Sequence, residues 1–117
     1  MTTTTMTKKI FTLRFRQGGE TVLTYRFDLN KPVKPTCDMV MVLGGYKDSL
    51  AYAKKLTDKK LWEQICHTAG MMYPMPYTST TRANLHTYLV EYYRRGNVIA
   101  QAEPGKKVEH DVLVMGE

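Results

Sequence analysis

Hydrophobic and polar residues alternate in two stretches near the start of the chain, from Lys9 to Arg16 and from Thr21 to Leu29. In both, every second residue is large and apolar, which is the signature of a β-strand with one buried face. Gln17–Gly18–Gly19–Glu20 separates them, and paired glycines supply the positive φ angles of a tight hairpin turn. The pattern predicts an antiparallel β-hairpin over residues 9–29.

The opposite face of this hairpin is polar and basic. It carries Arg14, Arg16 and Arg26, with threonines between them. Antiparallel sheets commonly leave one face in water, so we expect these arginines to be exposed. They are therefore candidate residues for binding a partner.

The segment after the hairpin is less regular. Pro32 and Pro35 break regular structure, so residues 30–36 are interpreted as a linker. The apolar run Met39–Leu43 fits a short buried strand, and it fits a hydrophobic loop packed under helices equally well. Gly44 and Gly45 end it.

Three helices are expected next, over residues 46–56, 58–69 and 82–95. In the second and third, apolar residues recur three and four positions apart and form one stripe on each helix. Thr57 is the expected N-cap of the second helix, and residues 78–81 offer several N-caps for the third. Gly70 and Gly96 are placed to end these two helices.

A second hairpin is expected at the end of the chain. Residues 97–102 and 108–115 read as its strands, and residues 103–107, with Pro104–Gly105 at the centre, read as its turn. The expected fold is therefore α+β: an N-terminal antiparallel hairpin, three helices and a C-terminal hairpin. We expect a single domain over residues 1–117, with residues 1–8 flexible and residues 46–115 forming the helical unit.

Charge adds a hint about the partner. The 117 residues include 17 Lys and Arg against 11 Asp and Glu, a formal net charge of +6, which favours nucleic acid or another acidic surface. No apolar run approaches the roughly 20 residues of a membrane span, and no secretory signal is visible. We therefore expect a cytoplasmic protein, no membrane contact, and reduced thiols at Cys37 and Cys66.

Catalytic and metal-binding patterns are not found in the sequence. His67, His86 and His110 lack metal-ligand spacing, and there is no phosphate-binding glycine loop or nucleophile elbow. We expect no enzymatic activity, no metal and no cofactor.

The C-terminal half of the chain resembles the winged helix-turn-helix family. The resemblance rests on the Ser/Thr-rich start and leucine spacing of residues 78–89, on Tyr93–Arg94–Arg95–Gly96 before an apolar strand, and on a Gly-Lys-Lys turn. It covers residues 58–114, although the connection at residues 70–77 is longer than the family's turn. The resemblance implies a double-stranded DNA-binding regulator or accessory factor, of a phage or mobile element, acting as a dimer.

In that interpretation the helix Thr80–Arg95 enters the major groove. If its leucines face the core, small polar residues lie on the other side, and Asn84 can pair with an adenine edge. Basic residues at the helix end and in the turn would contact phosphates. The predicted nucleic-acid-binding residues are Thr80, Arg82, Asn84, Thr87, Arg94, Arg95, Lys106 and Lys107.

A non-enzymatic, phage-type inhibitor or adaptor that binds a host protein is the alternative. The loop Met71–Tyr77 is rich in methionine, tyrosine and proline, and such residues are frequent in protein interfaces. Tyr73 and Tyr77, with the hairpin arginines, would carry that contact. A third alternative is a small sponge that holds a nucleotide signal through Arg, Asn and Tyr side chains.

Overall fold

Two N-terminal strands form the hairpin that the alternation predicts. In the computed structural model, which describes residues 9–31, 33–73, 78–97 and 112–116, β1 (Ile10–Gln17) pairs with β2 (Glu20–Asp28) in antiparallel register. Gly18 and Gly19 join them at φ angles of 61° and 83°, a left-handed conformation that favours glycine. The hairpin prediction is confirmed.

The sheet has a third strand from the other end of the chain. Strand β3 (Val112–Gly116) lies parallel to β1, on the side opposite β2, and gives the order β2-β1-β3. From the sequence, this segment was expected to pair with residues 97–102 instead. Residues 98–111 lie outside the described part of the chain, so the predicted first strand and turn of the second hairpin are not tested. The pairing with β1 was not predicted.

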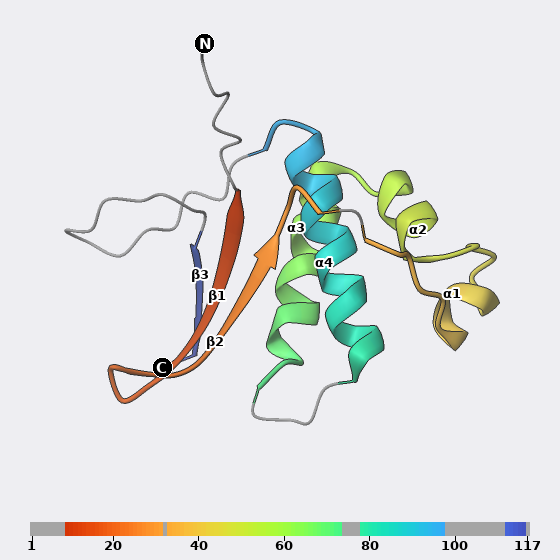
Figure 1. Cartoon of the computed structure of the whole chain (residues 1–117). Helices are drawn as coiled ribbons and strands as arrows, with labels where there is room; N and C mark the ends of the chain where they lie inside the picture. Colours follow the sequence, from red (N-terminus) through yellow and green to blue (C-terminus); the bar gives the residue numbers. More distant parts are fainter. Residues whose placement is uncertain (1–8, 32, 74–77, 98–111, 117) are drawn as a thin grey trace, which may run out of the picture.

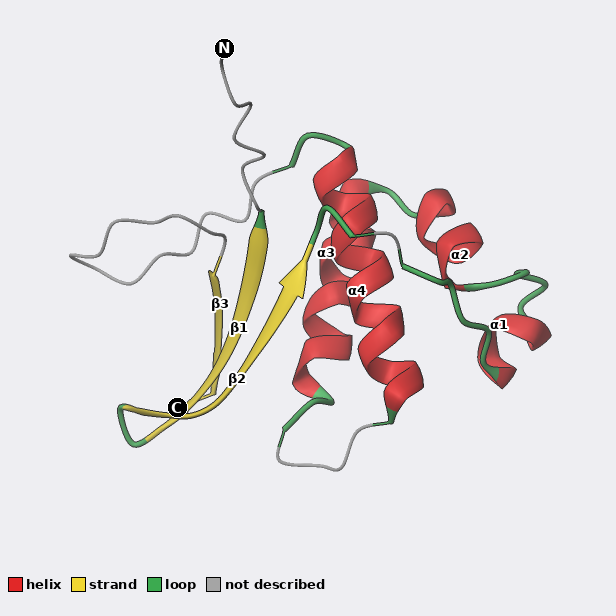
Figure 2. Ribbon diagram, viewed as in Figure 1, coloured by secondary structure: helices red, strands yellow, loops and turns green. Residues whose placement is uncertain are grey.

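The helices lie on one face of the sheet in two tiers (Figures 1 and 2). The long helices α3 (Asp58–Gly70) and α4 (Ser79–Arg94) pack side by side next to the sheet, and α2 (Ser49–Lys55) packs on α4 beyond them. The hairpin's apolar face meets this helical layer: Phe11, Leu13 and Phe27 are fully buried there with Leu61 and Leu89. The fold is α+β, as expected.

Helix ends follow the predicted capping chemistry in most places. The Thr57 hydroxyl accepts a hydrogen bond from Lys60 N at the start of α3, and Thr78 does the same for Thr81 N at the start of α4. Gly96 follows α4 at φ 90°, as a C-terminal stop requires. Gly70 instead forms the last residue of α3, and Met71 caps it.

Met39–Leu43 corrects an expectation. This segment is a short helix, α1, rather than a buried strand or a packed loop. The carboxylate of Asp38 accepts a hydrogen bond from Met41 N at 2.9 Å and caps the turn. Met41 alone among the five is buried. A run of five apolar residues carries no period, and the capping aspartate before it decides the structure.

No helix in the described ranges is long and apolar enough to cross a membrane.

Candidate binding pocket beside helix α1

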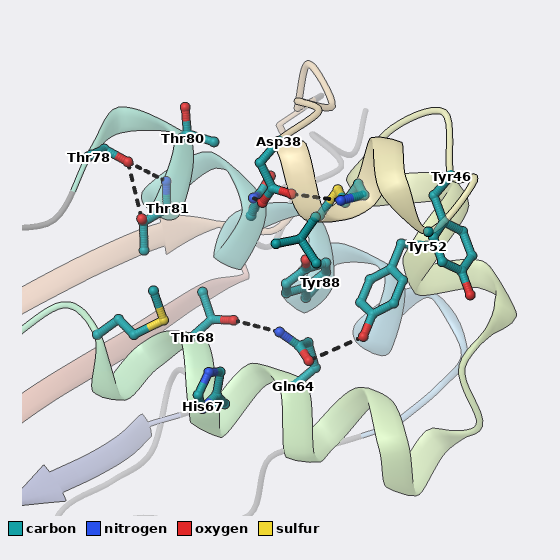
Figure 3. A pocket seen from close by; sticks show the side chains of 15 residues that line it. Asp38, Tyr46, Tyr52, Gln64, His67, Thr68, Thr78, Thr80, Thr81 and Tyr88 are labelled. Atoms are coloured by element: carbon teal, nitrogen blue, oxygen red, sulfur yellow. Dashed lines mark hydrogen bonds between the residues drawn. The ribbon is translucent and has the colours of Figure 1, made fainter.

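An open pocket of about 700 Å³ lies between α1, α3 and α4 (Figure 3). Its apolar walls include Met41 from α1 and Met71 after α3, and two tyrosines, Tyr46 and Tyr52, close one side. The volume falls within the range of about 300–1,000 Å³ that is typical of ligand pockets. The pocket is therefore large enough for a small molecule or for side chains of a partner.

Three tyrosines form an aromatic wall. The Tyr46 and Tyr52 ring centroids are 5.0 Å apart and nearly perpendicular, and the Tyr52 and Tyr88 centroids are 6.1 Å apart. The Tyr52 hydroxyl donates to Gln64 Oε1 at 3.3 Å, and Gln64 Nε2 donates to the Thr68 hydroxyl at 3.3 Å. Figure 3 shows this chain of hydrogen bonds running along α3. It fixes the orientation of the Gln64 amide.

Tyr88 stands out among the lining residues. Its side chain is only 2% exposed, yet its hydroxyl has no hydrogen-bond partner among the residues that the structure describes. Burial, and then the nearby Tyr52 and Asp38, raise the pKa of the phenol far above its usual value. The hydroxyl therefore stays protonated and can donate a hydrogen bond to a molecule bound in the pocket.

Asp38 and Asn84 hold the segment before α1 against α4. The Thr36 hydroxyl donates to Asn84 Oδ1, and Asn84 Nδ2 donates to Asp38 Oδ2 at 3.4 Å. The other oxygen of Asp38 caps α1. One asparagine on α4 thus fixes both the linker and the start of α1.

The outer side of α1 is apolar and faces solvent. Its residues Met39, Val40, Val42 and Leu43 are between 57% and 80% exposed. Scattered apolar residues on a surface are ordinary, but four on one turn beside a pocket form a patch. We call these four residues the α1 patch.

Lysines lie on the neighbouring surface of α2 and α3. The lysines at positions 47, 54, 55, 59 and 60 are all exposed. Lys55 Nζ lies 5.9 Å from the centre of the Tyr46 ring, a tyrosine that lines the pocket. We call these five lysines the lysine border.

The predicted nucleic-acid-binding residues of α4 do not share one exposed face. Asn84 and Thr87 are buried, and the Thr87 hydroxyl donates to Ala83 O. The prediction that these two face solvent is wrong, because α2 and the linker cover that side of α4. Thr80 is half-buried and lines the pocket.

Arg82 is exposed but engaged. Its guanidinium lies 5.7 Å from the Tyr25 ring centre and 5.2 Å from that of Phe27, and it donates to Arg26 O at 3.3 Å. It therefore fastens α4 to the hairpin.

Arg94 and Arg95 are paired with Glu91, whose side chain is 1% exposed. Arg94 binds both carboxylate oxygens at 2.8 Å, and Arg95 Nε binds one at 2.9 Å. Arg95 also contacts Asp58 Oδ1 and Ala53 O, each at 2.9 Å. Hydrogen bonds from Arg94 and Arg95 lower the pKa of Glu91 despite its burial. Arg95 thus ties the end of α4 to α2 and α3, and Arg94 pairs with Glu91 within α4.

Of the three hairpin arginines, one is exposed as expected and two are not. Arg26 is exposed, whereas Arg14 and Arg16 are half-buried, and Arg16 donates to Gly19 O at 3.1 Å. Tyr73 is half-buried against Phe15, with ring centroids 5.3 Å apart. Three further predicted residues lie outside the described ranges: Tyr77, Lys106 and Lys107.

Residues that bind metals do not cluster in the described ranges, where no three His, Cys, Asp or Glu side chains come together. His86 Nε2 lies 2.8 Å from Asp28 O, and Cys37 and Cys66 are both free thiols. Burial raises the pKa of the Cys66 thiol.

Comparison of the chain with protein-family models, curated proteins and solved structures gives no significant match.

Sequence reasoning missed the pocket itself. Tyr46 and Tyr52 meet Tyr88 only because α2 folds back onto α4, and no local pattern encodes that contact. One signal was readable in advance: Asp38 before a short apolar run is the start signature of a helix.

Proposed function

We propose that this protein is a non-enzymatic inhibitor or adaptor that binds an acidic partner protein through the α1 patch. The observation that carries the proposal is the exposure of four large apolar residues on one helical turn beside an open pocket. Folding gains nothing from leaving them in water, because burying such a side chain stabilises by about 1.5–3 kcal/mol. Contact with a partner supplies that burial.

Charge specifies the partner further. The lysine border is exposed, Lys55 lies against the pocket residue Tyr46, and the protein carries a net charge of +6. Acidic residues on the partner would pair with the lysines and speed association, while apolar side chains of the partner enter the pocket. The fitting partner segment therefore carries two or three apolar anchors flanked by Asp or Glu, as in helix-in-groove recognition.

Selection from a displayed random-peptide library tests the proposal. We expect selected peptides to combine apolar anchors with flanking acidic residues, and to bind more weakly as salt rises. Leu43→Ser should weaken binding of these peptides about tenfold, because the lost anchor contact is worth about 1–2 kcal/mol. Titration of purified variants with a labelled peptide measures the change.

Val22→Ser is the matched control, because Val22 is also an exposed apolar residue but lies on β2, away from α1. The control should bind as the parent does. The proposal fails if the selected peptides are basic or share no apolar anchors, or if Leu43→Ser binds them unchanged.

Nucleic-acid binding is a second candidate, supported by the exposed lysine border and by Arg26. In this case the lysine border, rather than the buried polar side of α4, would contact phosphates. The measurement that separates the two is duplex DNA binding at low salt. Lys54→Glu together with Lys59→Glu should abolish it, whereas Leu43→Ser should leave it unchanged.

A further inference from the structure

We propose that the pocket beside α1 binds a neutral planar ring with a lactam edge, an N–H next to a C=O, as found in nucleobases. This inference does not rest on the proposed function, although the two share a wall of the pocket, since Val40 of the α1 patch is among its lining residues.

The shape of the pocket suits a flat ring. Its volume of about 700 Å³ exceeds that of a single side chain, and the tyrosine wall offers aromatic faces on one side. Met41 and Met71 lie among the remaining apolar lining residues. Methionine adapts its shape to aromatic ligands and makes favourable sulfur–ring contacts. A base or nucleoside of ordinary size fits such a space.

The polar groups of the pocket supply one donor and one acceptor. The protonated hydroxyl of Tyr88, a residue that is 2% exposed and lines the pocket, can donate to a carbonyl oxygen. Asp38 accepts one hydrogen bond at each carboxylate oxygen, from Met41 N and from Asn84 Nδ2, and each oxygen has a further lone pair. A ligand N–H can use that lone pair. A donor and an acceptor in one pocket match a ring edge that carries both an acceptor and an N–H, and the lactam edge of a nucleobase is one such edge.

Charge at the pocket selects a neutral ligand. No lysine or arginine is among its lining residues in the described part of the chain, while the carboxylate of Asp38 is. A phosphate group would be repelled there rather than bound. The structure therefore favours an unphosphorylated base or nucleoside over the phosphorylated signal that the sequence suggested.

Calorimetric titration with uridine and guanosine tests the inference. Both carry a lactam edge, whereas 3-methyluridine has its N–H blocked. We expect uridine or guanosine to bind at millimolar concentration or below, and 3-methyluridine to bind at least about tenfold more weakly than uridine. Uridine monophosphate should bind no better than uridine.

Tyr88→Phe removes only the hydroxyl and should weaken binding about threefold to tenfold, the effect of one lost hydrogen bond. Tyr93→Phe is the matched control, since Tyr93 is an exposed tyrosine on the same helix and outside the pocket. Thermal melting establishes that both variants are folded. Leu43→Ser should bind the nucleoside as the parent does, which separates this inference from the proposed function.

Three outcomes would overturn it: no binding of either nucleoside at millimolar concentration, equal binding of 3-methyluridine and uridine, or unchanged binding by folded Tyr88→Phe.

Discussion

Asn84 shows how a single side chain can be correctly placed on a helix and wrongly interpreted. The leucine spacing puts it on the polar side of α4, which suggests a residue free to contact a base. In the structure it is 5% exposed and joins Thr36 to Asp38. Periodicity indicates which side of the helix is polar, but it does not indicate that the linker covers that side.

Asn84→Ala should therefore act on stability. It leaves Thr36 and Asp38 short of partners in a half-buried place, so we expect the free energy of unfolding to fall by about 1–3 kcal/mol. Urea denaturation followed by circular dichroism measures the loss. Ser79→Ala, a change at an exposed serine on the same helix, is the control and should lie within about 0.5 kcal/mol of the parent. Equal midpoints for the two variants would contradict this role of Asn84.

Glu91 is the buried charge on which two arginines depend. Glu91→Gln should lower the free energy of unfolding by about 2–3 kcal/mol, less than for a fully buried pair because Arg94 is 62% exposed and can return to water. Glu63→Gln, at an exposed glutamate on α3, should have little effect.

The pH dependence of this variant follows from the lowered pKa of Glu91. A carboxyl group with a lowered pKa in the folded protein stabilises it fully above its ordinary value of 4.5, and loses this effect as pH falls through the folded pKa. The stability difference between parent and Glu91→Gln should therefore be large at neutral pH and shrink in acid. A difference that is constant down to pH 3 would show that Glu91 does not act through its charge.

Helices and strands that contain several apolar repeats could be predicted. A very short helix and a pairing between strands far apart in the sequence could not. The hairpin, α3 and α4 each carry enough apolar repeats, with caps such as Thr57 and Gly96, to fix their type and approximate ends. Helix α1 has five residues and no period. Strand β3 was expected, but its partner lies far away in the sequence, and pairing at that distance depends on packing of the whole chain.

The candidate binding surfaces follow the same division. The hairpin arginines were found because alternation sorts a strand into two faces. The α1 patch and the tyrosine wall were not, since they arise where α1 and α2 fold onto α4. The physical reason is that a site assembled from several elements leaves only a weak sequence pattern within any one of them.

The complete sheet depends on the last strand. Removal of residues 112–117 deletes β3 and with it Leu113, which is 3% exposed, and it leaves one edge of β1 unpaired. We expect the free energy of unfolding to fall by at least the roughly 2–5 kcal/mol of a buried Leu→Ala change. Urea denaturation of the shortened chain measures this.

Leu113→Ala is the comparison for that deletion, because it keeps the backbone pairing and loses only the side chain. It should be less destabilising than the deletion. A shortened chain with the midpoint of the parent would mean that β3 contributes nothing to the sheet.

The parallel pairing of β1 with β3 also has a consequence for synthesis. Strand β1 ends at Gln17 and β3 begins at Val112, so the ribosome adds about 95 residues between them. At roughly 5–20 residues per second, one edge of β1 waits about 5–20 seconds for its partner. Throughout that time one edge of β1 keeps unpaired backbone groups, which are open to pairing with another chain until β3 covers them.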